Sequence, residues 1–285
     1  MQAYIERNYL ATAEADNLLK SGRSYNYYTY ANQTDNYAQD HVQLLTNHRI
    51  SASWNLDLNA HYTYGRGFYE EFKPEAALEN YGLNSKISTD LVRQKWLDND
   101  FYGTTFSLQY EGSTKFKFNF GGAWNKYVGR HYGLITEGKS LPASYKNYEW
   151  YRSRSQKTDL NLYAKANVAL AIDWSAYLDL QYRTVGHTML GTADKFLTLA
   201  NQNTYQFFNP KAGLTHQISD ESKIYSSISL GSKEPSRQDF VDNPNSAPRP
   251  EYLQDYEVGY QRNGEKYGFQ LNGYFMDYKD QLVLT

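Results

Sequence analysis

Residues 102–110 read YGTTFSLQY and residues 116–124 read FKFNFGGAW, with the turn-type tetrapeptide EGST between them at 111–114. In both runs, large apolar or aromatic side chains alternate with small or polar ones, which is typical of a β-strand with one apolar face. The two runs predict an antiparallel hairpin with a tight turn. Within the stretch 99–127, each run is roughly 12 residues long, from 99 to 110 and from 116 to 127. This exceeds the about 5 to 6 residues of an ordinary strand and suffices for the about 9 to 11 tilted residues that cross a bilayer.

The same alternation recurs in four further pairs of segments, so that about ten strands are expected. These pairs are residues 41–50 with 56–64, 160–168 with 174–182, 208–218 with 224–230, and 252–260 with 267–275. Short turns join the members of each pair, and longer polar segments separate the pairs. We expect these longer segments to be loops, at about 70–98, 129–156, 188–204 and 234–250. Alternating short and long connections are typical of a transmembrane β-barrel, with short periplasmic turns and long extracellular loops.

The two faces of the predicted strands differ in chemistry. The apolar positions would meet lipid, and we expect the following residues to share the convex face: Phe106, Leu108, Phe116, Phe118, Leu160, Leu178 and Ile228. The intervening positions would line a wet lumen, and they include Asp57, Lys117, Lys165, Asp179, Arg183, Lys211, Asp255 and Glu257. Trp54 and Trp174 lie beside short turns and Trp124 lies near the far end of its strand, positions that suit the two aromatic belts of a membrane protein.

Composition is compatible with this fold. The chain has 285 residues, 29 Tyr, no Cys, a net charge of −2 and a mean hydropathy of −0.77. A polar average does not oppose a barrel, because only alternate residues of its strands meet lipid. Near-neutral charge gives no electrostatic case for nucleic acid, and the lack of Cys excludes disulfides. A soluble antiparallel sandwich or propeller is the alternative, for which shorter strands would be expected.

The N-terminal part does not alternate. Residues 3–20 predict a short helix, so residues 1–38 are interpreted as an extracellular loop with a short helix, followed by a partial barrel over 39–285. The opening MQAYIER lacks the basic and apolar segments of a secretory signal. For an outer-membrane protein, we therefore expect either that a signal was removed or that the chain is a piece of something longer.

Three late segments carry a family resemblance. They read GSKEPSRQDF at 231–240, PRPEYLQDYEVGY at 248–260 and MDYKDQLVLT at 276–285. Further pieces are DNY at 35–37, GRGFYE at 65–70, LVRQKWL at 91–97 and FNPKAG at 208–213. Together they resemble the late barrel strands of TonB-dependent outer-membrane receptors, in particular those of Bacteroidetes-type bacteria. The combination is specific, whereas each piece alone is weak.

The resemblance implies a Gram-negative outer-membrane receptor that imports a scarce nutrient such as a ferric siderophore, haem, cobalamin or a glycan. Family members contact the TonB energy-transducing protein through a plug domain inside a 22-stranded barrel, and a surface lipoprotein is a further partner the resemblance suggests. This chain has about ten predicted strands and no plug-like segment, so it is interpreted as an internal barrel fragment. Alone it would leave open sheet edges, which lipid does not tolerate.

Little in the sequence suggests covalent chemistry. None of the six His residues has a metal-ligand spacing, and no nucleophile or nucleotide motif stands out, so neither an enzyme nor a cofactor is expected. The predicted loop at 129–156 is rich in aromatic and Arg residues, which bind ligands by stacking and charge. The residues interpreted as ligand-binding are Tyr148, Trp150, Tyr151, Arg152 and Arg154, with loop packing as their alternative role. Arg237 and Glu257 are candidates for an inward ionic network against a plug, with a solvated lumen charge as the alternative. An outer-membrane enzyme of the omptin or lipid-deacylase type and a passive porin remain alternative functions.

Overall fold

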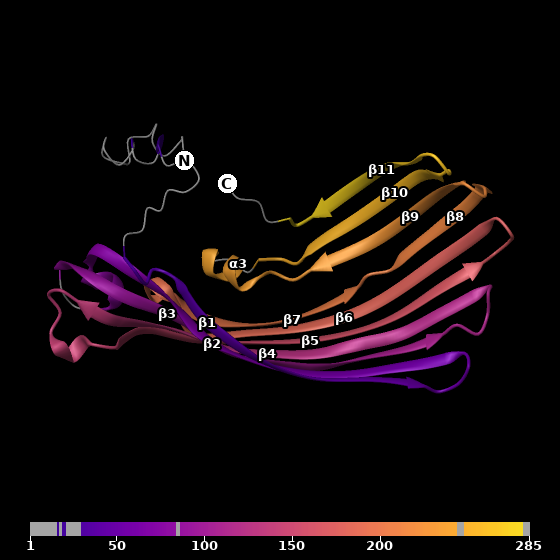
Figure 1. Cartoon of the computed structure of the whole chain (residues 1–285). Coiled ribbons are helices and arrows are strands. Elements are labelled where there is room, and N and C mark those ends of the chain that lie inside the picture. The colour runs from indigo at the N-terminus through magenta and orange to yellow at the C-terminus, as the bar shows by residue number, and fades with distance from the viewer. Residues whose placement is uncertain (1–15, 17–18, 21–29, 84–85, 244–247, 282–285) are drawn as a thin grey trace.

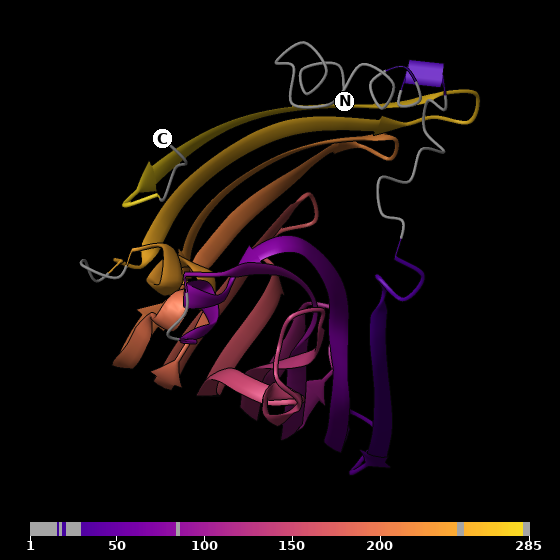
Figure 2. The ribbon, with the colours of Figure 1, turned by 90° about the vertical axis from the view of Figure 1, so that its left-hand side faces the viewer.

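In the computed structural model, the described residues are 16, 19–20, 30–83, 86–243 and 248–281. They form one antiparallel sheet of eleven strands that bends into an open trough (Figures 1 and 2). The strands are β1 Asp35–Arg49, β2 Trp54–Ala77, β3 Ser88–Tyr110, β4 Phe116–Gly138, β5 Tyr148–Ala169, β6 Trp174–Thr192, β7 Thr198–Phe208, β8 Lys211–Ser219, β9 Ser222–Lys233, β10 Glu251–Asn263 and β11 Gly268–Lys279. Short helices are η2 Leu78–Tyr81, η3 Ala143–Tyr145, η4 Asp194–Phe196 and α3 Arg237–Asp242.

All five predicted pairs of strands are confirmed. The hairpin predicted from residues 102–110 and 116–124 is formed by β3 and β4, in which Tyr110 pairs with Phe118 directly above the turn. Neighbouring strands follow the chain order from β1 to β11, apart from β7, and β1 and β11 lie at the two edges of the sheet. The predicted N-terminal helix and loop fall mainly on residues outside those that the structure describes, while β1 already begins at Asp35 within the predicted loop.

Three of the four predicted loops are much shorter than expected. β2 and β3 are separated only by residues 78–87, β4 and β5 by 139–147, and β6 and β7 by 193–197. The strands continue past the point where apolar side chains stop, because cross-strand hydrogen bonds do not require an apolar face. Alternation of hydrophobicity marks lipid contact, and it ends before the strand does.

The predicted strand at 208–218 is interrupted near its start. β7 pairs with the far half of β6, up to Tyr182 opposite Phe208, and β8 pairs with the half next to the short turn, from Asp179 opposite Lys211. Between them Pro210 has no N–H to donate, although its carbonyl accepts from Leu230 at 3.0 Å. β7 and β8 together make one crossing, so the eleven strands make the ten crossings expected.

The strand register confirms that the predicted apolar residues share one face. Directly paired residues lie on the same face of a sheet, and from β1 to β10 the even-numbered positions form apolar rows such as Leu56, Leu108, Phe120, Ala164 and Leu180. Many of these side chains are exposed, among them Leu58, Phe120, Leu162, Leu178 and Ile228. A soluble monomer rarely exposes so wide an apolar surface.

The opposite face is polar and concave. Lys165 forms an ion pair with Asp179 there at 3.5 Å, and Gln109 donates to Asp57 at 3.0 Å. The polar face also contacts α3, which Figure 1 shows inside the trough, so the apolar face is the convex one.

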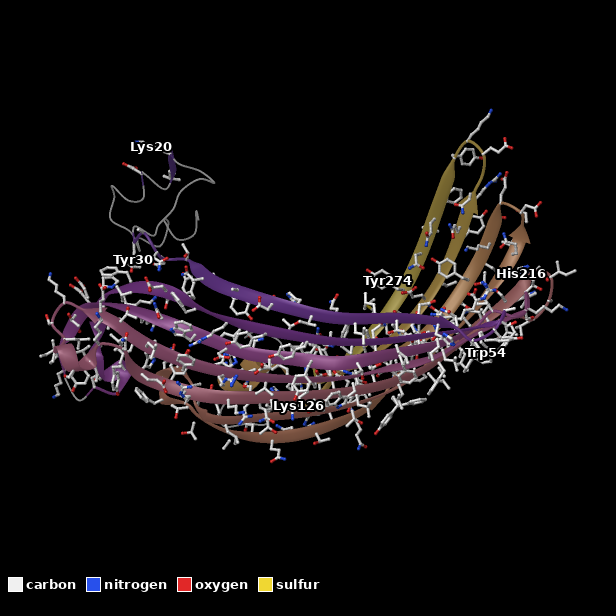
Figure 3. The ribbon with its side chains drawn as sticks, turned by 60° about the horizontal axis from the view of Figure 1, so that its bottom comes forward. Lys20, Tyr30, Trp54, Lys126, His216 and Tyr274 are labelled. Atoms are coloured by element: carbon white, nitrogen blue, oxygen red, sulfur yellow. The ribbon has the colours of Figure 1, made fainter. Side chains whose placement is uncertain are left out.

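The apolar face has the height of a membrane. It extends along β4 from Phe116 to Lys126, which at about 3.3 Å per residue and a tilt of about 40° corresponds to about 25 Å. Aromatic pairs mark both borders: Trp54 lies 4.9 Å from Tyr110 near the short turns, and Tyr102 lies 6.0 Å from Trp124 at the other border. In Figure 3, Trp54 lies at the short-turn end of the sheet and Lys126 near its middle.

We call the exposed apolar rows between these borders the apolar band, and the part of the strands beyond Lys126 the upper wall. No helix within the described residues is long and apolar enough to span a membrane.

Candidate functional site

An ion-pair cluster on the inner face, at the border between the levels of the apolar band and the upper wall, is centred on Glu234, the residue that follows β9. The Arg183 guanidinium on β6 donates to both carboxylate oxygens of Glu234, at 2.8 and 3.1 Å. Lys157 on β5 donates to one of the same oxygens, and Arg183 also pairs with Asp159. Glu234 is only 7% exposed, so its charge is balanced within the protein.

The electrostatics of Glu234 follow from these contacts. Burial raises the pKa of its carboxyl group, but hydrogen bonds from Lys157 and Arg183 outweigh burial and leave the pKa below its ordinary value. Glu234 is therefore a carboxylate at neutral pH, and it ties the chain after β9 to two strands that lie earlier in the sequence.

The helix α3 begins three residues after this anchor, at Arg237. Ser236 accepts a hydrogen bond from the Asp239 amide, and the Asp239 side chain accepts one from the Ser236 amide at 2.7 Å, which is a capping box. Phe240 is buried against Met189 and Leu199, and its ring lies 6.0 Å from that of His187. Residues 234–242, which we call the α3 segment, are thus held to the inner wall at both ends.

A cavity of about 740 Å³ lies between the α3 segment and the upper wall. Its lining includes Lys95, His131, Tyr151, Asp194 and Arg237. The size falls within the range of small-molecule sites, and its aromatic, cationic and amide groups are those that orient a polar ligand.

Asp194 in η4 organises one side of this cavity. It forms an ion pair with Lys95 on β3 at 2.7 Å and accepts from the Trp150 indole on β5 at 3.1 Å. Burial raises the pKa of the Asp194 carboxyl group, but the hydrogen bonds from Lys95 and Trp150 prevail and lower it overall. Lys95 is consequently neutralised, whereas no carboxylate among the described residues pairs with Arg237, whose guanidinium contacts the Ser153 hydroxyl at 3.5 Å.

The five residues predicted to bind ligand were expected in a loop, but the structure places them at the start of β5. Trp150 is 3% exposed and packs with Leu91 and Ile135, in keeping with the alternative packing role. Tyr151 is in the same cluster but also lines the cavity. The structure does not bring the five together: Tyr148 packs at the rim of that cluster, and Arg152 and Arg154 are exposed on the outer face.

Sequence reasoning missed most of the cavity. Its residues come from β3, β4, β5, η4 and α3, which lie far apart in the chain. The available signal was Ser236-x-x-Asp239, a capping pattern inside what was interpreted as a Pro-rich loop. No ion pair joins Arg237 to Glu257 in the described part of the chain, and the predicted network of these two residues against a plug stays a prediction. The carboxylate that ion pairs hold to the wall is that of Glu234.

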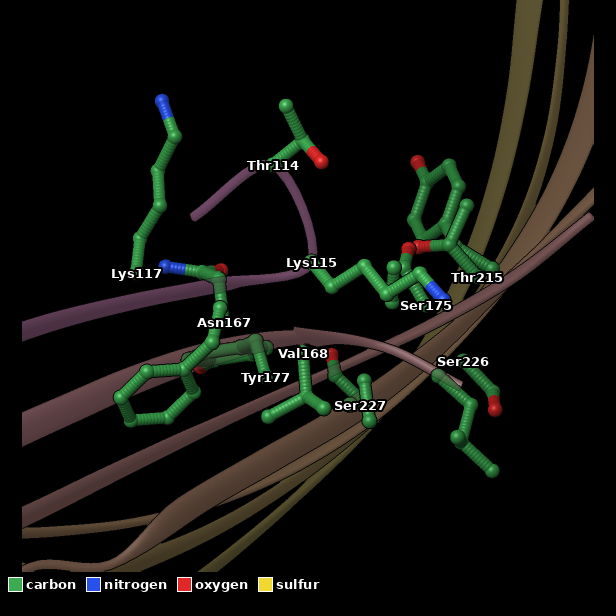
Figure 4. A pocket seen from close by; sticks show the side chains of 16 residues that line it. Thr114, Lys115, Lys117, Asn167, Val168, Ser175, Tyr177, Thr215, Ser226 and Ser227 are labelled. Atoms are coloured by element: carbon green, nitrogen blue, oxygen red, sulfur yellow. The ribbon is translucent and has the colours of Figure 1, made fainter. Parts of the chain in front are cut away.

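A second cavity, of about 470 Å³, lies on the inner face near the short turns. Figure 4 shows its lining, where Lys117 and Asn167 are directly paired on β4 and β5. Hydroxyl groups of Ser175, Thr215 and Ser227 line the same space. These polar groups share the lining with apolar side chains such as Val168 and Leu214.

Comparison with known proteins identifies a family of β-barrels to which this architecture corresponds. The family model described as TonB dependent receptor-like, beta-barrel, matches residues 3–285. None of the curated proteins compared with the chain matches it significantly.

Among solved structures, the chain is similar to the copper transporter OprC, with a TM-score of 0.67 and 13% identity over 87% of this chain and 40% of that one. It is also similar to the siderophore receptor PiuA from Acinetobacter baumannii, with a TM-score of 0.62 and 14% identity over 85% and 40%. A third is the ferric-catecholate import receptor Fiu from K12 E. coli, with a TM-score of 0.61 and 11% identity over 94% and 44%. At these identities the likeness concerns the fold, and the chain spans about 40% of the length of the structures that it matches.

Proposed function

The chain belongs to the TonB-dependent receptor β-barrel family, and from this premise we propose that it acts in outer-membrane uptake of a scarce nutrient. The nutrient would enter from the extracellular side, bind within the upper wall and pass through the barrel. Energy would come from the TonB protein acting through a plug domain, which would rest against the polar inner face near Lys117 and Asn167. Strands beyond those of this chain would close the sheet edges at β1 and β11.

The chemistry of the proposed ligand is inferred from the cavity between the α3 segment and β3–β5. It presents Arg237, which has no carboxylate partner among the residues that the structure describes, beside the aromatic ring of Tyr151. An unpaired guanidinium next to an aromatic ring recognises an anionic group by charge and the attached ring system by stacking. A ferric siderophore with a net negative charge has this chemistry; PiuA is described as a siderophore receptor and Fiu as a ferric-catecholate import receptor.

The experiment measures uptake of radiolabelled ferric siderophores by iron-starved cells that produce this receptor as their one route for the compound. Arg237→Gln should lower uptake about tenfold or more, because it removes one charge-assisted contact of the ligand. The matched control is Arg249→Gln, whose side chain is 78% exposed and makes a 3.7 Å ion pair with Asp280 away from the cavity.

The energy source separates this proposal from a passive porin. Uptake should stop when TonB is deleted or the proton gradient is collapsed. Uptake that continues unchanged in those cells would support a porin, and equal uptake by Arg237→Gln and Arg249→Gln would remove the cavity from the proposal.

A further inference from the structure

Two cations of the cavity beside the α3 segment differ in their partners. Lys95 on β3 forms an ion pair with Asp194 in η4 at 2.7 Å. Among the described residues no carboxylate pairs with Arg237, which lines the same cavity. The Lys95 and Asp194 side chains are 35% and 34% exposed and also line it, so a ligand in the cavity meets both. Asp194 therefore decides whether the charge of Lys95 is available to a ligand.

Asp194 is held in place more firmly than Lys95. Its Oδ1 atom accepts hydrogen bonds from the Trp150 indole at 3.1 Å and from the Lys195 amide at 3.0 Å. The backbone beside it has a defined shape, because Lys195 and Phe196 adopt φ angles of 60° and 57°, a region that residues other than glycine rarely occupy. Lys95 reaches Asp194 through a flexible aliphatic stem. A ligand would thus move Lys95 more easily than Asp194.

The ion pair affects a second anionic group of a ligand rather than the first. In the proposed function, the first group binds the Arg237 guanidinium while the attached ring stacks on Tyr151. A second anionic group that approaches Lys95 also approaches the Asp194 carboxylate, and like charges brought together at a binding site disfavour that ligand. Lys195 lines the cavity as well, but its side chain is exposed, so its ammonium group stays hydrated and mobile.

We propose that Asp194 determines the specificity of the cavity by holding Lys95 in a neutral pair, so that the cavity prefers a ring with one anionic substituent to a ring with two. This role rests on the proposed function, since it takes the cavity as the ligand site. Removal of the Asp194 charge frees Lys95 to contact the second anionic substituent and reverses the preference.

The test compares benzoate with isophthalate, which have the same ring and differ by one carboxylate. The purified receptor in detergent is titrated with each probe, and the dissociation constants are measured by ligand-detected NMR. The unaltered receptor should bind benzoate at least as tightly as isophthalate. Asp194→Asn keeps an oxygen for the Trp150 indole but removes the charge. It should shift the ratio of the two dissociation constants about tenfold toward isophthalate, as expected for one added charge-assisted hydrogen bond.

A second substitution shows whether Lys95 makes the added contact. Asp194→Asn/Lys95→Gln should return the ratio to that of the unaltered receptor, because no ammonium group is left to be freed. Glu79→Gln is the matched control: it removes an exposed carboxylate from η2, outside the cavity lining, and should keep the unaltered ratio. Should Asp194→Asn fail to fold, as judged by its migration in unheated gels, Asp194→Ser takes its place.

The role of Asp194 would be overturned by an unchanged ratio in Asp194→Asn, by a shift that persists without Lys95, or by an about tenfold preference for isophthalate in the unaltered receptor. Arg237→Gln separates these results from a failure of the proposed function, because it should weaken the binding of both probes. Where it weakens neither, the cavity is not the ligand site, and the proposed function loses its support there. Weaker binding of both probes by Arg237→Gln, together with an unchanged ratio in Asp194→Asn, would overturn the role of Asp194 alone.

Discussion

The guanidinium of Arg183 and the carboxylate of Glu234 face each other in a bidentate pair, with Nη1 2.8 Å from Oε2 and Nη2 3.1 Å from Oε1. The two residues are 51 positions apart in the chain. Since Arg183 lies on β6 and Glu234 begins the α3 segment, this pair fixes one wall of the cavity to the barrel. The geometry of the cavity therefore depends on a contact outside its own lining.

Glu234→Gln should loosen the α3 segment. The substitution leaves Arg183 and Lys157 without their shared carboxylate, and a part-buried charge that loses its partner costs about 1–3 kcal/mol. Amide hydrogen exchange of residues 237–242, measured on the receptor in membranes, should become about fivefold to 150-fold faster, which is the rate factor that corresponds to this free energy. Glu221→Gln is the control, because its exposed 3.0 Å pair with Arg262 contributes only about 0–1 kcal/mol. Equal exchange in the two variants would contradict this role of Glu234.

Protection of the same segment should depend on pH. The pKa of Glu234 lies below its ordinary value of 4.5, so its stabilising contribution is fully present above about 4.5 and is lost as the pH falls through the lower, folded-state pKa. Exchange of residues 237–242, corrected for its intrinsic pH dependence, should stay constant above pH 4.5 and rise below it. Glu234→Gln should lack this rise, because an amide does not titrate, and a rise of the same size in this variant would assign it to another group.

The part of the strands that faces lipid could be predicted from the sequence. The alternation around Phe106 and Phe118 predicted both the hairpin and the shared apolar face. Every second side chain of a barrel strand contacts lipid, so apolar side chains recur with a period of two. Beyond Lys126 both faces meet water or the lumen, so hydrophobicity carries no periodic signal there. The upper wall was therefore interpreted as loops, and the predicted site at Tyr148–Arg154 was placed in one of them.

The cavity could not be predicted from the sequence, because the pairing register of the strands decides which distant residues come together around it. Lys157 and Glu234 are 77 residues apart, and only the pairing of β5 through β9 brings them together. The outer position of Arg154 likewise follows from its parity with Leu160 on β5, a relation that becomes informative once the strand is known to begin at Tyr148. Parity then assigns each charged residue of the upper wall to the lumen or to the outside.

Gly65→Ala should destabilise the first hairpin. A Cβ atom at Gly65 would lie 2.0 Å from the Tyr37 hydroxyl, which donates to the buried Asn99 side chain at 2.7 Å. The Tyr37 ring must move, and Asn99 loses its partner at a cost of about 1–3 kcal/mol. Thermal unfolding, followed by gel migration after heating in steps, should occur at a lower temperature. Gly186→Ala is the control, since nothing lies within 4 Å of its added Cβ, and its midpoint should stay unchanged.

Two neighbouring residues of β3 test the assignment of the faces, on which the position of the lumenal cavity depends. Leu108 lies in the middle row of the apolar band, where an Arg should cost about 2–4 kcal/mol because its charge would have to leave water. Gln109 lies on the inner face and donates to Asp57 at 3.0 Å, so Gln109→Arg gains a carboxylate partner and should be tolerated. Leu108→Arg should therefore reduce the amount of folded receptor in outer membranes, while Gln109→Arg should leave it near the original level. The reverse result would place Leu108 toward the lumen and exchange the inner and outer faces of every strand paired with β3.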